Sequence, residues 1–146
     1  MMCVLASKTT LQNGKLANDN TAPCFLIDAT GTHTADRYRM IYCTTYFEGH
    51  VYPIAFCFAP SESIAGCSML VQALIKAKIF VNSKDVTIIT DAGDAVNSPV
   101  GEHLDQVKRG HCYAHLINTD LWNNKNKFST LDKFRKFNGD IKRVAR

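Results

Sequence analysis

The chain has no long hydrophobic run. Among its 146 residues, no uninterrupted apolar stretch approaches the ~20 residues that a membrane-spanning helix requires. Residues 1–23 also lack the charged start followed by an apolar block that is typical of a secretory signal. We therefore expect a protein without a membrane segment that is not secreted.

Sequence motifs of several common enzyme classes are absent as well. There is no G-x-x-x-x-G-K-[ST] loop, no Rossmann glycine fingerprint and no nucleophile elbow. These absences exclude P-loop nucleotide binding, dinucleotide binding through a Rossmann motif, and hydrolysis by a nucleophile–histidine–acid triad. The six cysteines are scattered, three of them within apolar runs, which indicates a reducing compartment and not a disulfide scaffold.

Positive charge is concentrated at the end of the sequence. Residues 123–146 hold eight Lys or Arg against two Asp, so this segment carries +6, and the rest carries −2 of the total of +4. Apolar residues recur there every three or four positions, at Phe128, Leu131, Phe134, Phe137, Ile141 and Val144. The spacing predicts a basic amphipathic helix, whose charged side is either a solvated surface or a contact for an anionic partner.

Apolar periodicity predicts strands and helices after residue 23. The predicted strands cover residues 24–28, 38–47, 51–59, 86–90 and 111–113, with a tight turn at 48–50. The predicted helices cover 61–78, 94–107, 115–122 and 128–144. Pro99 and Gly101 are expected to interrupt the second of these helices. Residues 1–23 are polar without a clear period, so we expect a poorly packed leader.

This order predicts an α/β fold with a mixed sheet of the ribonuclease-H-like type. A three-strand antiparallel meander comes first and helix-connected strands follow, whereas a plain doubly wound fold would start with a βαβ unit. We therefore divide the chain into a polar leader (1–23), a ribonuclease-H-like core (24–122) and a helical basic extension (123–146).

Two aspartates stand where predicted strands end. Asp28 closes the run 24–28, and Asp91 follows the run 86–90. Ligands of an open α/β sheet gather beyond the carboxyl ends of its strands, and carboxylates bind Mg²⁺ and Mn²⁺. Taken singly, each aspartate fits a turn or a helix cap. Together with the strand order they predict a shared metal site for phosphoryl chemistry, whereas Asp94 fits a helix cap.

Cys112 and His115 form a C-x-x-H pair. Thiolate and imidazole are ligands that zinc accepts, but a structural zinc site needs four ligands and the sequence offers no convincing second pair. Two interpretations stay open. The pair is either half of a metal site, or a packed cysteine beside a hydrogen-bonding histidine.

Five short segments occur in a specific order and spacing. They are LIDAT at 26–30, EGHVYPIAF at 48–56, SES at 61–63, IITDAG at 88–93 and HCYAHL at 111–116. In these segments the chain resembles, from about Phe25 to Leu121, the catalytic domain of the MULE (Mutator-like element) transposases. These are DDE enzymes of the ribonuclease-H-like superfamily.

The resemblance implies a DNA transposase. Asp28 and Asp91 would be the first and second acids of the DDE triad and would bind Mg²⁺ or Mn²⁺, with Cys112 and His115 as the C-x-x-H that follows. It also implies strand cleavage and transfer on DNA, a homo-oligomeric transposition complex, and a nuclear location in a eukaryotic host or an intracellular one otherwise. The basic extension would contact DNA phosphates through Lys133, Arg135, Lys136, Lys142 and Arg143.

The sequence departs from the family pattern at two places. The tryptophan that family members carry in the helix after Glu62 is missing, and Cys67 and Met69 occupy that region. No Glu occurs after Glu102, so no residue matches the third, catalytic acid. We therefore expect a fragment, a degenerate copy or a truncated gene product that is inactive alone.

A different class of function stays open beside the transposase. The chain would then be a non-catalytic, domesticated or remnant ribonuclease-H-like module that binds nucleic acid or protein through its basic end. A related exonuclease or ribonuclease would need acids that this sequence does not offer.

Overall fold

The computed structural model describes most of the first 112 residues and a few beyond them. The described residues are 2–19, 22–29, 38–80, 85–91, 93–112, 115, 125–127, 129–130, 132–133 and 135–136. The chain divides into two compact units, Met1–Gly110 and His111–Arg146. No helix within the described ranges is long and apolar enough to cross a bilayer.

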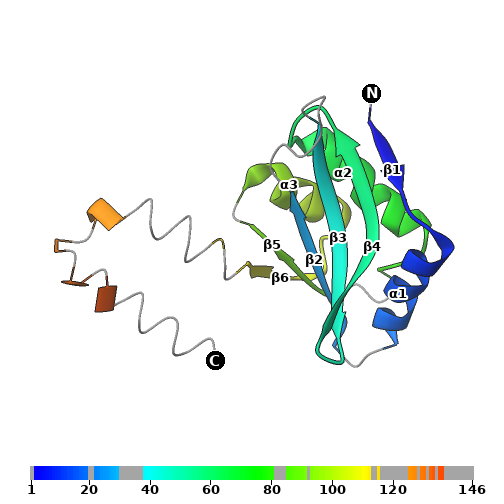
Figure 1. The fold of residues 1–146 in the computed structure, drawn as a ribbon, viewed down its shortest axis with the longest axis horizontal. Helices are drawn as coiled ribbons and strands as arrows, with labels where there is room; N and C mark the ends of the chain where they lie inside the picture. Colours follow the sequence, from blue (N-terminus) through cyan, green and yellow to red (C-terminus); the bar gives the residue numbers. More distant parts are fainter. Residues whose placement is uncertain are drawn as a thin grey trace. The chain divides into compact units, whose positions relative to one another are not determined.

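A six-stranded mixed sheet is the centre of the described structure (Figure 1). Its strands are β1 (Cys3–Leu5), β2 (Cys24–Ala29), β3 (Arg39–Phe47), β4 (His50–Ala59), β5 (Thr87–Thr90) and β6 (Lys108–His111). Their order in the sheet is β1-β4-β3-β2-β5-β6. Neighbours from β1 to β2 pair antiparallel, whereas β2 and β5 pair parallel. The parallel pair brings the carboxyl ends of β2 and β5 to the same edge of the sheet.

Three α-helices accompany the sheet: α1 (Lys8–Asn18), α2 (Ile64–Lys76) and α3 (Asp94–His103). A short 3₁₀ helix, η2, covers Lys125–Lys127. Helices α1 and α2 pack against β3 and β4, and α3 packs against α2. Figure 1 shows α2 and α3 behind the strands.

Strand alternation separates a buried face of the sheet from a half-buried face. The fully buried residues of the central strands include Phe25 and Ile27 in β2, Ile41 and Cys43 in β3, and Cys57 in β4. Their neighbours along the chain, including Leu26, Asp28, Tyr42 and Phe56, are half-buried. Asp28 therefore points away from the core, on the face opposite Ile27.

Glycine in α2 lets the helix lie close to this buried face. A Cβ at Gly66 would lie 2.9 Å from Cδ1 of Ile41 and 3.2 Å from Cβ of Ala59. The adjacent Cys67 is fully buried. Burial raises the pKa of its thiol to about 12, and the Glu62 carboxylate adds to the rise. Cys67 therefore acts as a small, protonated core residue.

The predicted meander, the helix after it and the fourth strand are all present. Strands β2, β3, β4 and β5 differ from their predicted bounds by one residue at most. The predicted tight turn is a two-residue hairpin loop in which Glu48 has φ 51° and Gly49 has φ 80°. Positive φ at both positions is typical of the type I′ turn that joins twisted strands.

The prediction of a poorly packed leader at 1–23 is wrong. Strand β1 pairs with the outer edge of β4, with Val4 opposite Cys57. Helix α1 begins with a capping box between Ser7 and Thr10, and Ala17 at its far end is fully buried. The capping box is visible in the sequence, but a three-residue strand forms only because β4 offers a partner edge.

Three other boundaries also differ from the predictions. Helix α2 begins at Ile64 after the cap Ser63, so Glu62 lies before the helix and pairs with Arg39 at 3.7 Å. Helix α3 continues through Pro99, whose ring is buried in the second turn. The predicted strand at 111–113 lies three residues earlier, as β6, because the amide of Lys108 bonds to the Val86 carbonyl at 2.9 Å.

The remaining predicted elements fall mostly outside the described residues. The helix at 115–122 is represented there by His115 alone, and the helix at 128–144 by six residues between 129 and 136. Both helices, and the division into 1–23, 24–122 and 123–146, stay predictions.

Candidate metal centre

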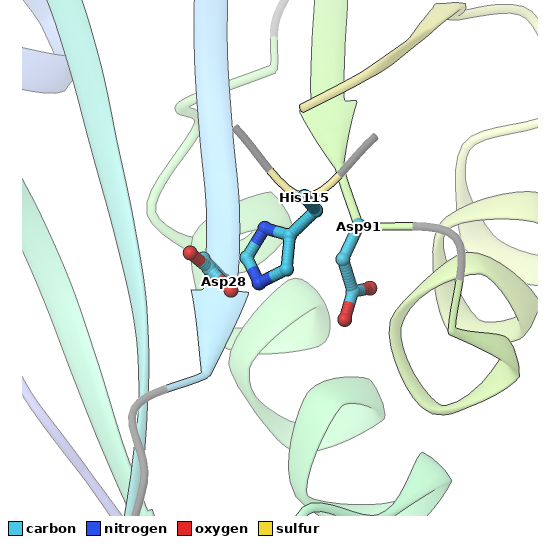
Figure 2. A group of neighbouring side chains, drawn as sticks. All are labelled: Asp28, Asp91 and His115. Carbon is cyan, nitrogen blue, oxygen red and sulfur yellow. The ribbon is translucent and has the colours of Figure 1, made fainter. Parts of the chain in front are cut away.

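Asp28 and Asp91 lie level with each other on neighbouring parallel strands. Leu26 of β2 is opposite Ile89 of β5. Two residues further along, Asp28 near the end of β2 comes level with Asp91, which directly follows β5. The structure thus brings together two predicted residues that are far apart in the sequence, and Figure 2 shows Asp28 on the last part of β2 and Asp91 just after β5.

The two carboxylates are close enough to share a cation. One oxygen of each lies within 4.8 Å of the other, and both residues are half-buried. Two like charges at this separation repel by roughly 1–3 kcal/mol, depending on how well water screens them. A divalent cation between them would replace that repulsion by attraction. Oxygen donors of this kind fit the hard cations Mg²⁺ and Mn²⁺, so the residues present suit such an ion.

Protein donors hold both carboxylates in place. The backbone N–H of Ala29 donates to Oδ1 of Asp28 at 2.8 Å, and the Tyr42 hydroxyl donates to its Oδ2 at 3.1 Å. The N–H of Gly93 donates to Oδ1 of Asp91 at 3.1 Å. Each bond leaves further lone pairs for a metal ion, because an ionised carboxylate offers about four acceptor sites.

Helix α3 anchors the strand end that carries Asp91. The Asn97 side chain donates to the Asp91 carbonyl at 3.0 Å and accepts from the Thr90 hydroxyl at 2.7 Å. A Cβ at Gly93 would lie 3.3 Å from both Asp91 carboxylate oxygens, so glycine leaves that carboxylate room. Asn97 was not among the residues predicted from the sequence. Its position one helical turn inside α3 was the available signal.

Asp94 is not the helix cap that the sequence predicts. The residue before helix α3 is Gly93, which makes no side-chain cap bond, and Asp94 is the first helical residue and is exposed. Its negative charge still suits the positive end of the helix dipole. Asp94 therefore contributes to the helix start without capping it.

Both residues of the predicted C-x-x-H pair belong to the second unit. Within the first unit, Asp28 and Asp91 are the side chains that could serve one metal ion together. His115 belongs to the second unit and is the third side chain drawn in Figure 2. Cys112 is half-buried and belongs to no such group in the described part of the chain. Zinc binding by the pair stays a prediction.

The structure describes three of the five residues that are predicted to contact nucleic acid. Lys133, Arg135 and Lys136 are exposed, and Arg135 lies 3.7 Å from Asp132. An exposed ion pair of this kind is weak, so it leaves Arg135 available to other anions. Lys142 and Arg143 lie outside the described residues.

Comparisons with known proteins leave the family open. No protein-family profile matches the chain, and no curated protein matches it. A chain in the cryo-EM structure of a simian T-cell lymphotropic virus intasome, in complex with the PP2A regulatory subunit B56 gamma, is similar with a TM-score of 0.38 and 14% identity. The similarity covers 79% of this chain and 46% of that chain. A likeness at this level assigns neither a family nor a function.

Proposed function

We propose that this chain is a partial catalytic domain of a DNA transposase, similar to the MULE transposases, in which Asp28 and Asp91 hold Mg²⁺ or Mn²⁺. The observation that carries the proposal is the parallel β2–β5 register, which makes the two aspartates level. Their oxygens approach within 4.8 Å at the strand ends, where α/β folds bind ligands.

The order of elements supports a ribonuclease-H-like fold. An antiparallel meander of β2, β3 and β4 precedes α2, the parallel strand β5, α3 and β6. This is the order that the sequence predicts for such a sheet. In this fold the first and fourth strands of the core are neighbours, and here these strands are β2 and β5.

In the proposed reaction, the protein groups orient an ion at the sheet edge. When bound, a divalent cation would supply activation of water and stabilisation of the charge that develops at phosphorus during cleavage of a DNA strand. Asp28 and Asp91 would hold the ion from one side. Ala29, Tyr42 and Gly93 fix the carboxylates through their hydrogen bonds.

The third acid of the family pattern has no match within these 146 residues. The family places a third acid well downstream, and no Glu follows Glu102 here. We therefore expect the chain alone to cleave or transfer DNA weakly or not at all. Assembly into a homo-oligomer and a nuclear location remain further predictions of the resemblance.

Isothermal titration calorimetry with Mn²⁺ tests the proposal. The wild-type protein should show one saturable site, which Asp28→Asn and Asp91→Asn each abolish because either change leaves a single carboxylate. Asp105→Asn is the matched control, since Asp105 is exposed and lies beyond α3. A His115→Ala variant tests whether the imidazole also binds the ion.

The outcomes separate clearly. No heat from folded wild-type protein, or binding that survives both aspartate substitutions, would rule out the proposed site. Robust Mg²⁺-dependent DNA cleavage that is lost in Asp28→Ala would instead show that this chain is active without a third acid.

A non-catalytic nucleic-acid-binding module is the second candidate. Lys133, Arg135 and Lys136 support it, because they are exposed and close together in the sequence. Under this alternative the basic residues determine binding, and the two aspartates do not matter.

A further inference from the structure

An apolar pocket lies on the half-buried face of the sheet, within the first unit of the chain. Its volume is about 140 Å³. Four strands supply its walls, which include Cys24 and Leu26 of β2, Thr44 and Tyr46 of β3, Val51 of β4 and Ile89 of β5. Helix α2 packs on the opposite, buried face, where Gly66 lies against Ile41. The pocket is therefore separate from the core between the sheet and α2.

Strand register places this pocket next to the candidate metal centre. Leu26 and Ile89, which both line the pocket, are opposite each other on the parallel strands β2 and β5. Asp28 is two residues beyond Leu26 and therefore on the same face of the sheet, and Asp91 is two residues beyond Ile89. Two residues of a strand span about 7 Å. A molecule in the pocket would thus have its neighbouring groups within reach of an ion between the aspartates.

The size and the walls of the pocket indicate which chemical group it accepts. A cavity of ~150 Å³ with apolar walls holds one benzene molecule, so this pocket has the size of a single six-membered ring. Its wall atoms are mostly apolar. Tyr46 and Val51 are 59% and 63% exposed and therefore lie at the mouth of the pocket. A flat ring that enters between them can stack on the tyrosine.

A lysine on the same face supplies positive charge for an anionic ligand. A Cβ at Gly110 of β6 would lie 3.5 Å from Cγ1 of Ile89, so Gly110 faces the pocket wall. Lys108 precedes Gly110 by two residues, so it lies on the same face, and it is exposed. A nucleotide has the complementary parts, because it joins a flat base through a sugar to a phosphate that lysine or a divalent cation binds.

We infer that this pocket is a subsite for one unpaired pyrimidine base of a DNA strand, a phosphate of which lies at the metal centre. The inference rests on the proposed function, which supplies both the DNA and the ion. It goes further by assigning a base to named residues. The base has to leave the double helix, because a pocket of this size does not admit a base pair. Stacking on Tyr46 supplies the affinity.

Fluorescence anisotropy with two short, labelled single strands tests the inference. One strand is oligothymidylate, and the other has the same length and phosphates but abasic sites in place of the bases. Tyr46→Ala removes the aromatic ring, whereas Tyr46→Phe keeps it. Leu16→Ala is the matched control, because it shortens a side chain of α1 that is 46% exposed. Thermal unfolding checks that all variants are folded.

Wild-type protein should bind oligothymidylate about tenfold more tightly than the abasic strand, which is within the range that stacking of one base on an aromatic side chain provides. Tyr46→Ala should abolish this preference, whereas Tyr46→Phe and Leu16→Ala should keep it. Affinity for the abasic strand should be the same in all four proteins, because none of the substitutions changes a charge that contacts phosphate.

Mn²⁺ calorimetry on the same samples separates a failure of this inference from a failure of the proposed function. Wild-type protein that binds no Mn²⁺ overturns the proposed function, and the inference with it. Wild-type protein that binds Mn²⁺ through Asp28 and Asp91 but binds the two strands equally overturns the inference alone. A preference for oligothymidylate that survives Tyr46→Ala also overturns it, because the base then binds elsewhere.

Discussion

Asn97 links the end of β5 to α3 with both ends of its amide group. Its nitrogen donates to the Asp91 carbonyl and its oxygen accepts from Thr90, which is 3% exposed. The bonds fix the backbone from which the Asp91 carboxylate projects. Asn97 is not itself a ligand, but it thus determines the position of the candidate metal ligand Asp91.

Asn97→Ala should weaken both stability and metal binding. The buried Thr90 hydroxyl and the Asp91 carbonyl lose a partner, which costs about 1–3 kcal/mol of unfolding free energy. The less constrained Asp91 should lower Mn²⁺ affinity about tenfold. Thermal unfolding and Mn²⁺ calorimetry measure the two effects.

Thr90→Val is the control for this prediction. It removes the Thr90 hydroxyl but leaves the bond from Asn97 to Asp91, so it should change stability and spare Mn²⁺ affinity. If Asn97→Ala binds Mn²⁺ as tightly as wild-type protein, Asn97 has only a structural role.

At the scale of elements, the β3–β4 hairpin contains a residue ill suited to its backbone. Glu48 has φ 51° and is followed by Gly49 with φ 80°. Type I′ turns favour Asn-Gly, because asparagine tolerates the left-handed region better than other residues with a side chain. Within the part of the chain that the structure describes, the exposed Glu48 side chain makes no hydrogen bond that would offset this strain.

Glu48→Asn should therefore stabilise the protein by roughly 1 kcal/mol. Chemical denaturation should show a higher midpoint at an unchanged slope. Glu48→Ala removes the same charge without the left-handed preference and should give no comparable gain. Equal midpoints for the two variants would mean that charge, and not backbone conformation, decides this position.

Elements also differ in how far local sequence predicts them. Strand β2 is an apolar run up to Asp28, strand β5 has two isoleucines before Thr90 and Asp91, and both strands were predicted within a residue. Strand β6, with exposed Lys108 and Arg109, has no alternating pattern and was placed three residues late. It is a strand because the edge of β5 binds it. The residue pattern of a single segment does not show whether another strand offers an edge with which it can pair.

At the scale of the whole molecule, the two candidate functions depend on different residues. A metal-dependent transposase domain depends on Asp28 and Asp91, whereas a binding module depends on Lys133, Arg135 and Lys136. Electrostatic DNA binding falls with salt at a slope of about 0.9 per phosphate contact on a logarithmic scale.

Fluorescence anisotropy with a short DNA duplex separates these functions. If the binding module is correct, the triple variant Lys133→Ala, Arg135→Ala and Lys136→Ala should lower affinity and reduce the salt slope by about 2.7, which corresponds to three phosphate contacts. Asp91→Asn should then bind normally. A triple alanine variant at the exposed residues Lys8, Lys15 and Lys76 controls for net charge. An equal loss in both triple variants would indicate non-specific attraction.

Local sequence was sufficient to predict the meander, the strand after α2, and two aspartates at strand ends. Apolar periodicity and turn residues are local properties, and these features follow from them. The level positions of Asp28 and Asp91, the hydrogen bonds from Tyr42 and Asn97, and the packing of β1 and α1 on β4 appear only in the tertiary structure. The physical reason is that register and edge pairing join segments distant in sequence, and no single segment encodes the position of its partner.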